Sequence, residues 1–527
     1  MRAFAQLLDR LAFTPSRNGK LRLMEIYFRA EPDPQRGWAL AILTGGLDLK
    51  LQVRKAISEL MASRVDAELF RLSREYVGDT AETVALLWPA PAESAEPPSL
   101  AQVVAELDGA DAAALAVLLE RWLNRLDATG RWALLKLVTG GLRVGVSSRL
   151  AKTAAANMGG IDVAEVEELW HGLAPPYRDL FAWLEGREAK PDISDRLVFR
   201  PLMLAHPLED GALDNLDPGE FAAEWKWDGI RVQVASKSGE TRLFSRAGDD
   251  ITSAFPDVAD GNWGDVVLDG ELLVLREGVL APFNDLQQRL NRKSVSKKML
   301  KDYPAHIRLY DILFAQGDDL RAHSFTKRRD RLEHWFACHG PERADLSELV
   351  SFGSFETLAE MWAQTRGKSI EGLMIKRKAS TYLAGRPKGH WFKWKRAPLS
   401  LDTVLMYAQR GSGKRSSFYS DYTFGAWREN EEGGLELVPV GKAYFGFTDE
   451  ELVQLDRWVR NNTVDRFGPV RVVKPGLVFE VAFDSVHRSR RHKSGVAMRF
   501  PRIHRIRWDK SAEEADRLDG LVSLIET

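Results

Sequence analysis

The sequence has little of several features that restrict where a protein works. Its 527 residues include one cysteine, Cys338, which excludes an intramolecular disulfide and a cysteine-rich zinc site and fits a reducing cytoplasm. Asp9 and Arg10 interrupt the first apolar run too early for a signal peptide. No stretch reaches the roughly 20 apolar residues that a membrane span requires. We therefore expect a cytoplasmic globular protein, which at this length folds into about two to four domains.

An overall excess of positive charge is also absent, because the formal net charge is −1. Lysine and arginine are instead concentrated in two segments, 386–396 and 484–510, which hold five and nine of them. Aromatic residues are interleaved with these charges, among them Trp391, Trp394 and Trp508. Such segments are expected to be folded, and folded basic surface is typical of phosphate binding.

The hydrophobic periodicity divides the chain into three parts. Residues 1–195 have apolar residues at helical spacing and predict an all-α domain. Residues 196–397 change to short apolar strands between glycine, proline and charged turns, which predicts an α+β domain with antiparallel sheets. Residues 398–527 contain five expected short strands and one helix, a pattern that fits an OB-fold β-barrel. The predicted fold is therefore multidomain.

Two segments of the helical part resemble each other. Thr44-Gly45-Gly46-Leu47 and Thr139-Gly140-Gly141-Leu142 each follow a Trp-Ala-Leu segment. Paired glycines at a helix end let the backbone approach a phosphate and point amides at it, whereas the alternative is a packing turn. For the first copy both interpretations have equal weight. In the second copy, phosphate contact is favoured by the polar residues that follow directly: Arg143, Ser147, Ser148 and Arg149.

The hexapeptide Lys226-Trp227-Asp228-Gly229-Ile230-Arg231 carries the strongest chemical signal. It places a candidate amine nucleophile, an acid, a flexible glycine and an arginine within reach of one pocket. An amine that attacks phosphorus must be unprotonated, which burial or neighbouring cations favour. The alternative is a solvated hairpin, since these residue types are common on surfaces, so the motif by itself is a hypothesis.

Further motifs follow in a fixed order. The spacing Lys-x-Asp-Gly-x-Arg resembles motif I of the covalent nucleotidyltransferases, the superfamily of DNA ligases, RNA ligases and mRNA capping enzymes. The segments that resemble the remaining motifs are Ser245-Arg246, Leu268-Asp269-Gly270-Glu271, Leu309-Tyr310-Asp311-Ile312-Leu313, Glu371-Gly372-Leu373-Met374-Ile375-Lys376, Trp391-Phe392-Lys393-Trp394-Lys395, and Arg499-Phe500-Pro501-Arg502 with Arg507-Trp508-Asp509-Lys510. Because these matches occur in one order, the chain is identified as a member of this superfamily.

The helical part indicates which family within this superfamily the chain resembles. Gly78-Asp79-Thr80-Ala81-Glu82-Thr83 and Leu142-Arg143-Val144-Gly145 are similar to two signatures of the N-terminal DNA-binding domain of ATP-dependent DNA ligases. The resemblance implies a DNA-binding domain at 1–195, an ATP-grasp-like adenylation domain at 196–397 and an OB-fold domain at 398–527. Such a chain encircles nicked duplex DNA, here expected as a monomer. The residues expected to contact DNA are Gly141, Arg143, Gly145 and Ser147.

The resemblance also implies a reaction in three steps. The Lys226 amine attacks the α-phosphorus of ATP, which forms lysyl-AMP and releases pyrophosphate. AMP then passes to the 5′-phosphate of a nick, and the 3′-hydroxyl displaces it. Tyr310 is expected to stack on adenine and Glu224 to read the adenine edge through its side chain or backbone. The other residues expected to bind the nucleotide are Arg231, Arg246, Glu271, Arg386, Lys393 and Lys395.

Mg²⁺ is the implied metal, and motif VI has an expected role of its own. Mg²⁺ prefers oxygen ligands shared with substrate phosphates, so Glu271 and Glu371 are the predicted ligands. Glu271 also suits the ribose hydroxyl, and the alternative for either carboxylate is a structural ion pair. On a mobile OB-fold domain, the motif VI residues would orient pyrophosphate and later help to clamp DNA: Arg499, Arg502 and Lys510.

Two other functions compete with this interpretation. An RNA ligase or capping guanylyltransferase shares motifs I to V, but the helical part argues against it. A nucleic-acid clamp without activity is the other, although every residue that the chemistry requires is present. We expect a bacterial-type ATP-dependent DNA ligase of the cytoplasm and nucleoid that acts in replication, repair or recombination. Removal of residues 1–195 should leave self-adenylation largely intact and weaken nick sealing.

Overall fold

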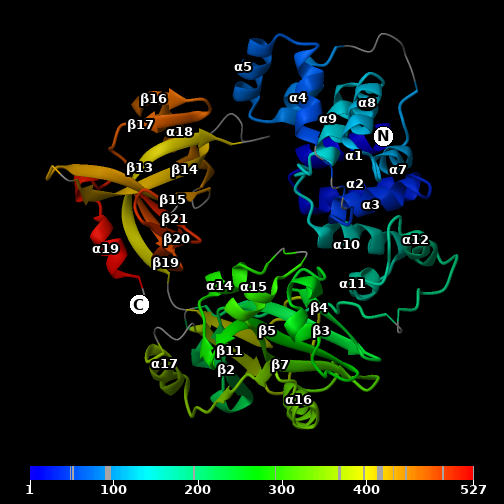
Figure 1. Ribbon diagram of the computed structural model, residues 1–527, viewed down its shortest axis with the longest axis vertical. Coiled ribbons are helices and arrows are strands. Elements are labelled where there is room, and N and C mark those ends of the chain that lie inside the picture. The colour runs from blue at the N-terminus through cyan, green and yellow to red at the C-terminus, as the bar shows by residue number, and fades with distance from the viewer. Residues whose placement is uncertain are drawn as a thin grey trace. The chain divides into compact units, whose positions relative to one another are not determined.

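The computed structural model contains two compact units (Figure 1). One unit comprises Met1–Gly160, Pro175–Glu188 and Pro398–Thr527, and the other comprises Ile161–Ala174 and Ala189–Ala397. The structure describes residues 1–47, 49, 51, 53–89, 96–193, 196–209, 211–290, 292, 294–365, 370–395, 398–411, 419–430, 432–444, 448–489 and 492–525. None of the helices in these ranges is long and apolar enough to cross a membrane.

The N-terminal region is helical, as predicted. Its helices are α1 (Arg2–Phe13), α2 (Arg17–Ala30), α3 (Gln35–Thr44), α4 (Val53–Ala62), α5 (Ala67–Val77), α6 (Thr80–Leu87), α7 (Leu100–Leu107), α8 (Ala112–Leu123), α9 (Ala128–Val138), α10 (Ser148–Gly159), α11 (Val163–Trp170) and α12 (Arg178–Leu184). Many of them begin at a serine or aspartate whose side chain accepts a backbone N–H of the first turn, which satisfies a donor that has no partner within the helix. These capping residues are Ser16, Asp66, Asp79, Ser99, Asp111, Asp127, Ser147 and Asp162.

This region contains two related halves, α1 to α4 and α7 to α10. Helix α2 packs against α10, and the corresponding α8 packs against α4. In the same way α1 packs against α9, and α7 packs against α3. The two halves therefore make equivalent helix contacts with each other, which confirms the relation that the repeated Thr-Gly-Gly-Leu segments predict.

The equivalent helix ends are also built alike. Thr44 and Thr139 each donate a hydroxyl hydrogen bond to the carbonyl four residues earlier, at 2.7 and 2.6 Å. The glycine after each threonine has a positive φ, 76° in the first copy and 67° in the second. A buried arginine lies eight residues before each threonine, Arg36 in the first copy and Arg131 in the second. Each arginine donates a hydrogen bond to the backbone carbonyl of the residue eight positions before the arginine.

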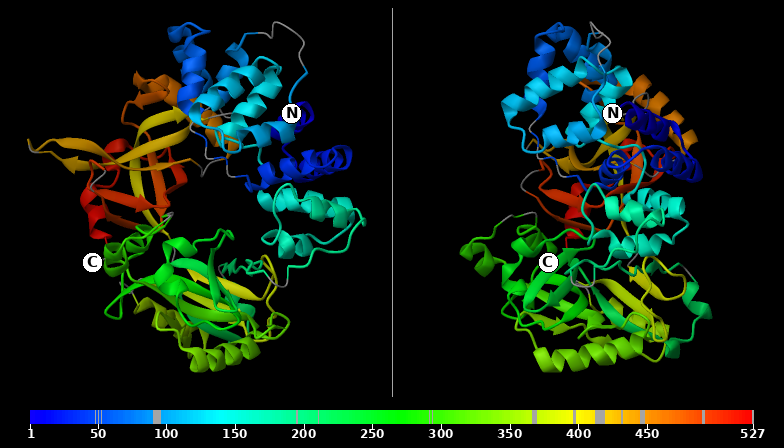
Figure 2. Two further views of the ribbon diagram at one scale, coloured as in Figure 1. Left: turned by 45° about the vertical axis from the view of Figure 1, so that its right-hand side comes forward. Right: turned by 90° about the vertical axis from the view of Figure 1, so that its right-hand side faces the viewer.

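The second unit is built on two mainly antiparallel sheets, so its α+β class agrees with the prediction (Figure 2). One sheet has the order β1-β12-β11-β2-β10 and the other β4-β3-β5-β7-β8, with β6 and β9 paired to β5 and β7. The strands are β1 (His206–Pro207), β2 (Phe221–Trp227), β3 (Ile230–Lys237), β4 (Glu240–Ser245), β5 (Val266–Arg276), β6 (Val279–Leu280), β7 (Ala305–Ala315), β8 (Asp318–Asp319), β9 (Ala344–Leu346), β10 (Leu349–Val350), β11 (Ile370–Arg377) and β12 (Trp391–Lys395).

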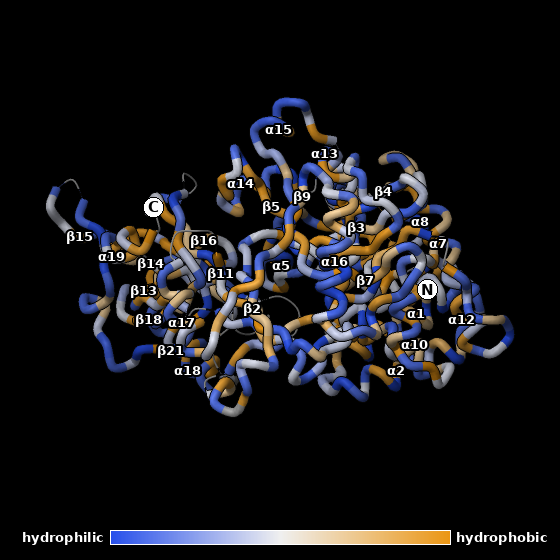
Figure 3. Tube along the Cα trace, turned by 90° about the horizontal axis from the view of Figure 1, so that it is seen from below, coloured by the Kyte–Doolittle hydropathy of each residue, from blue (hydrophilic) through white to orange (hydrophobic). Residues whose placement is uncertain are grey.

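Helices cover these two sheets, and each sheet has a hydrophobic core. The helices are α13 (Pro256–Ala259), α14 (Phe283–Gln287), α15 (Lys297–Asp302), α16 (Phe325–His339) and α17 (Phe355–Ala363). Helix α16 packs along β7 (Figure 1), and apolar colouring runs through β3, β5 and β7 (Figure 3). The two sheets are joined directly, because β2 ends at Trp227 and β3 begins at Ile230 in the other sheet.

The C-terminal region is rich in strands, as predicted, but its strands are more numerous than expected. In place of five, the described residues form β13 (Leu399–Arg410), β14 (Tyr419–Glu429), β15 (Leu435–Ala443), β16 (Thr463–Phe467), β17 (Val470–Val473), β18 (Val478–Phe483), β19 (Ser485–Arg488), β20 (Val496–Arg499) and β21 (Arg502–Arg507). The extra strands are short and carry many charges, so their apolar pattern is weak. The predicted helix is α18 (Asp449–Asn462), and α19 (Leu518–Ser523) follows β21.

Candidate active site

Lys226 lies at the end of β2, where three glycines allow the strands to approach closely. Its Cα pairs with that of Gly372 on β11. A Cβ on Gly372 would lie 2.2 Å from the carbonyl oxygen of Trp394, and one on Gly229 would lie 2.5 Å from that of Leu272. A Cβ on Gly270 would lie 2.6 Å from Ile307 Cγ2. Glycine is thus required at these motif positions by packing.

The amine of Lys226 is held by a carboxylate. Lys226 Nζ forms an ion pair with one oxygen of Glu371, and Lys395 Nζ forms an ion pair with the other oxygen. Burial alone would raise the pKa of Glu371, but the two ammonium groups outweigh it and the pKa lies below the ordinary value. Glu371 is therefore ionised and bridges two of the predicted active-site lysines.

Four of the predicted phosphate-binding cations gather beside Lys226. The pKa of Lys393 is lowered by burial and by the positive charges of Lys395, Arg386, Lys226 and Arg246. Lys393 and Lys395 lie on the same face of β12 because side chains alternate along a strand. A cluster of cations stabilises an anion placed among them.

Glu271 lies on β5 directly opposite Arg231 of β3. Burial raises the pKa of Glu271 to about 7, although the charges of Lys226 and Arg231 act in the opposite direction. The neighbouring carboxylates Glu371 and Asp228 raise it further. Glu271 thus belongs to the same charge cluster as Lys226.

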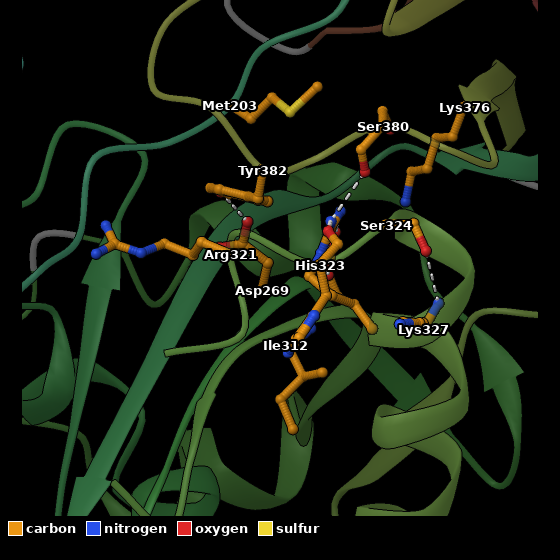
Figure 4. A network of polar contacts seen from close by, with 12 residues as sticks. Met203, Asp269, Ile312, Arg321, His323, Ser324, Lys327, Lys376, Ser380 and Tyr382 are labelled. Carbon is orange, nitrogen blue, oxygen red and sulfur yellow. Dashed lines mark hydrogen bonds and ion pairs between the residues drawn. The ribbon is translucent and has the colours of Figure 1, made fainter. Parts of the chain in front are cut away.

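Arg231 is held by groups on three segments. Its guanidinium donates to the Met203 carbonyl at 2.7 Å, to Asp269 Oδ2 at 2.7 Å and to the Tyr382 hydroxyl at 3.1 Å. Tyr382 donates its hydroxyl to the same Asp269 oxygen at 2.5 Å, and Figure 4 shows the Tyr382 ring beside Asp269. Burial raises the pKa of Tyr382 well above its ordinary value.

The adenine-binding candidates are surrounded by further buried charges. Glu224 is 2 % exposed and forms ion pairs with Lys376 at 2.5 Å and Arg329 at 3.4 Å. Burial raises the pKa of Glu224, and Lys376 and Arg329 oppose this. Lys376 Nζ also lies 4.7 Å from the ring centroid of Tyr310, whose pKa burial raises. Tyr310 and Glu224 therefore share one cationic neighbour.

Several residues of this network were not predicted from the sequence. Asp269 and Lys376 stand inside recognised motifs, so their positions carried a signal that was left unused. Asp311 also stands inside a motif, and it forms a fully buried ion pair with Arg328. Arg328 also donates a hydrogen bond to the Ser380 carbonyl at 3.0 Å. Arg328, Arg329 and Tyr382 lie outside the motifs, and nothing in their sequence surroundings identifies them.

The motif VI residues lie in the other compact unit. Arg502 forms an ion pair with Asp484 at 3.4 Å, and Lys510 forms one with Asp402 at 2.7 Å. Arg499 is the last residue of β20, and Phe500 beside it has 65 % of its surface exposed. The structure thus places Arg499 and Arg502 on either side of an exposed aromatic residue.

The predicted DNA-contact residues form one turn between α9 and α10. Lys20 Nζ donates to the carbonyls of Val144 and Gly145 at 2.7 and 2.8 Å, and Gly145 has a φ of 66°. The Ser147 hydroxyl accepts the N–H of Leu150 at 3.2 Å and so caps α10. Arg143 is exposed. Arg143 also borders a cavity of about 730 Å³ that Phe13, Leu86 and Trp132 help to line.

The two glycine turns differ in what covers them. A Cβ on Gly46 would lie 2.8 Å from the hydroxyl of Tyr177, a buried residue. A Cβ on Gly141 would meet only Thr139 and Lys136 of its own helix end, at 3.3 and 3.7 Å. A methyl group on the first turn would therefore meet a residue from elsewhere in the fold, whereas one on the second would meet only its own helix end.

Comparison with known proteins identifies the family of the chain. A lysine at a strand end among cations and carboxylates is the arrangement expected of an adenylating nucleotidyltransferase. The family model "ATP dependent DNA ligase domain" matches residues 202–395, and "ATP dependent DNA ligase C terminal region" matches 415–510. The chain belongs to the family of ATP-dependent DNA ligases, which seal nicks by forming phosphodiester bonds with release of AMP.

Curated relatives extend over nearly the whole chain. A probable DNA ligase of Koribacter versatilis is 32 % identical over 98 % of this chain and 95 % of the relative. DNA ligase 1 of Korarchaeum cryptofilum is 30 % identical over 100 % of this chain and 98 % of the relative. The solved structure named Pmar-Lig_PreS3 has a TM-score of 0.61 at 16 % identity and covers 96 % of this chain and 99 % of its own, which shows a shared fold.

Proposed function

We propose that Lys226 is the residue that accepts AMP from ATP. The observation that supports this most strongly is the charge cluster around its amine, with Glu371 in contact and Lys393 and Lys395 on β12 of the same sheet. The unprotonated amine forms an N–P bond to the α-phosphorus, and the P–O bond to pyrophosphate breaks. Arg246, Arg386 and the two strand lysines would neutralise the phosphates during this displacement.

Tyr310 and Glu224 would receive the adenine. The ring of Tyr310 supplies a stacking surface. The Glu224 carboxylate is occupied by Lys376 and Arg329, so we expect Glu224 to read the adenine edge through its backbone and to use its side chain to fix β2.

Glu271 and Glu371 are the residues that would hold Mg²⁺. Among the residues that the structure describes, no group of three or more His, Cys, Asp or Glu forms a metal cage. Two carboxylates with substrate phosphates are nevertheless the usual setting for Mg²⁺, so the donor set fits. Bound Mg²⁺ would neutralise charge on the reacting phosphates. Glu371 would then have to release at least one of its lysine partners.

The turn between α9 and α10 would bind the backbone of nicked duplex DNA. Arg143 supplies an exposed positive charge, and Gly141 leaves space for a close approach, whereas the space beside Gly145 is taken by the Lys20 amine. The Ser147 hydroxyl accepts a hydrogen bond from Leu150, so it remains able to donate its proton to a phosphate. Arg499, Arg502 and Lys510 would orient pyrophosphate in the first step, and domains at 1–195, 196–397 and 398–527 would enclose the DNA in the later ones.

Peptide mapping tests the assignment of the nucleophile. The chain is incubated with ATP and Mg²⁺ and digested, and the peptide that carries AMP is identified by mass spectrometry. We expect AMP on Lys226, loss of the adduct in Lys226→Ala, and an unchanged adduct in Lys237→Ala at the opposite end of β3. AMP on another lysine would contradict the proposal.

A further inference from the structure

Helix α11 precedes the adenylation domain in sequence but packs with it. Residues Ile161–Ala174 fall in the same compact unit as Ala189–Ala397. Gly172, which follows the helix, is held by two residues further along the chain. Its carbonyl accepts a hydrogen bond from Arg196, and a Cβ on Gly172 would lie 2.5 Å from Ile193 Cγ2. The helix is thus an integral part of the unit that contains Lys226.

Glu168 is the main polar attachment of α11. One carboxylate oxygen forms an ion pair with Arg200 at 2.6 Å, and the other forms one with Arg321 at 2.8 Å. The two guanidinium groups lie 4.8 and 4.7 Å from the centroid of the Phe314 ring on β7. Both are less than a quarter exposed, so water screens these pairs less than it screens ordinary surface ion pairs.

The Glu168 attachment continues to Arg231. The backbone carbonyl of Arg321 accepts the N–H of Tyr382 at 2.8 Å. Tyr382 in turn donates its hydroxyl to Asp269, which holds the Arg231 guanidinium. Figure 4 shows Arg321, Tyr382 and Asp269 together. A continuous series of polar contacts therefore leads from α11 to the motif that contains Lys226.

A second contact leads from α11 to the turn that carries Arg246. A Cβ on Gly248 would lie 2.2 Å from His171 Cε1, and Gly248 has a φ of 89°, so only glycine fits there. The His171 ring also meets the Phe199 ring edge-on, with 4.9 Å between centroids. Because the turn closes through a hydrogen bond from the Gly248 N–H to the Ser245 carbonyl, His171 packs directly against the segment that contains Arg246.

We propose that α11 is a positioning element of the adenylation site. Glu168 fixes the loop of Tyr382 and Arg386, and His171 fixes the turn of Arg246, without either residue touching the nucleotide. The inference rests on the proposed function, in which Arg231, Arg246 and Arg386 bind ATP. Loss of Glu168 should then weaken ATP binding before the N–P bond forms, although the residue lies outside every nucleotidyltransferase motif.

The test is single-turnover formation of the AMP adduct by the full chain over a range of ATP concentrations with Mg²⁺. Glu168→Ala should raise the ATP concentration for half-maximal rate by about fivefold. The matched control is Glu165→Ala on the same helix, which removes only an ion pair with Lys190 between two groups that are both more than 40 % exposed. This control should leave the half-saturating concentration unchanged.

A purely structural role gives a different result. Partial unfolding lowers the amount of adduct at saturating ATP and leaves the half-saturating concentration unchanged, and that result for Glu168→Ala would overturn the inference. Arg321→Gln should reproduce the effect of Glu168→Ala, and the double variant should add little because the two residues act in one network. Fully additive effects would also overturn it.

Failure of the underlying function is recognised separately. If the unmodified chain forms no adduct on Lys226, the proposed nucleophile is wrong and the proposed role of α11 is overturned as well. If the adduct forms with equal ATP dependence in the unmodified chain, Glu168→Ala and Glu165→Ala, then only the role of α11 is overturned.

Discussion

The proposed adenylation site and the proposed DNA-binding turn between α9 and α10 are built differently. Around Lys226 the charges are only partly exposed and are paired with one another, as in the contacts of Glu371 with Lys226 and Lys395. At the turn, Arg143 is exposed, and a Cβ on Gly141 would meet only its own helix end. Buried charges require fixed partners, because an unpaired charge away from water is costly. An exposed turn carries no such requirement, so substitutions there act on binding to DNA more than on folding.

The largest expected effect is at the nucleophile. Lys226→Arg should abolish the AMP adduct while nick binding persists, because a guanidinium is not deprotonated at working pH and cannot attack phosphorus. Adduct formation with ATP and Mg²⁺ is measured by intact mass, and nick binding by mobility shift. Since the arginine can still form an ion pair with Glu371, a folding defect is not expected. A covalent adduct on this variant would contradict the assignment.

The turn is expected to give a smaller effect that depends on salt. Arg143→Ala should weaken binding to nicked duplex by about tenfold, because it removes one charge-assisted hydrogen bond to phosphate. The slope of log affinity against log salt should fall by about one unit. The adduct with ATP should form at the normal rate.

Arg10→Ala is the matched control for the turn, since Arg10 is also an exposed arginine of the helical region. Equal losses in Arg10→Ala and Arg143→Ala would mean that Arg143 contributes only general positive charge.

The paired glycine turns offer a comparison within the helical region. Gly46→Ala should destabilise the fold by about 1 kcal/mol, because the added methyl group overlaps the hydroxyl of buried Tyr177. Gly141→Ala should change stability by less than about 0.5 kcal/mol, because the methyl group would meet only side chains of its own helix end, and should weaken nick sealing instead. Thermal unfolding and sealing assays on both variants measure this. Equal changes in thermal stability and in nick sealing for the two variants would mean that the two turns have the same role.

Much of this architecture is predictable from the sequence, and there are physical reasons why the rest is not. The gathering of Lys226, Glu271, Glu371, Lys393 and Lys395 is predictable because the motifs that carry them occur in the order of one superfamily. The sequence predicts a loop at Lys226, however, and the structure places this residue on β2. The partners that hold them, such as Tyr382 and Arg329, come from segments that only the tertiary fold brings near.

The grouping of α11 was also not predictable. Its helical periodicity matches that of residues 1–160, yet it packs with the adenylation domain. Removal of residues 1–195 therefore removes Glu168 and His171 too. Self-adenylation of that truncated chain should be slower than sequence alone predicts.

The smallest expected effect is a change of stability with pH, which should depend on Glu271 and not on exposed Arg143. Burial raises the pKa of Glu271 to about 7 in the folded chain, well above the ordinary value of 4.5. The folded state then binds more protons than the unfolded state between these values, so its stabilising contribution is complete below pH 4.5 and is lost as the pH rises through about 7. Glu271→Gln has no such proton to lose. Its melting temperature relative to the unmodified chain, without ligand, should therefore increase from about pH 5 to about pH 8, whereas that of Arg143→Ala should stay level. A constant difference for Glu271→Gln would show that burial does not hold a proton on Glu271.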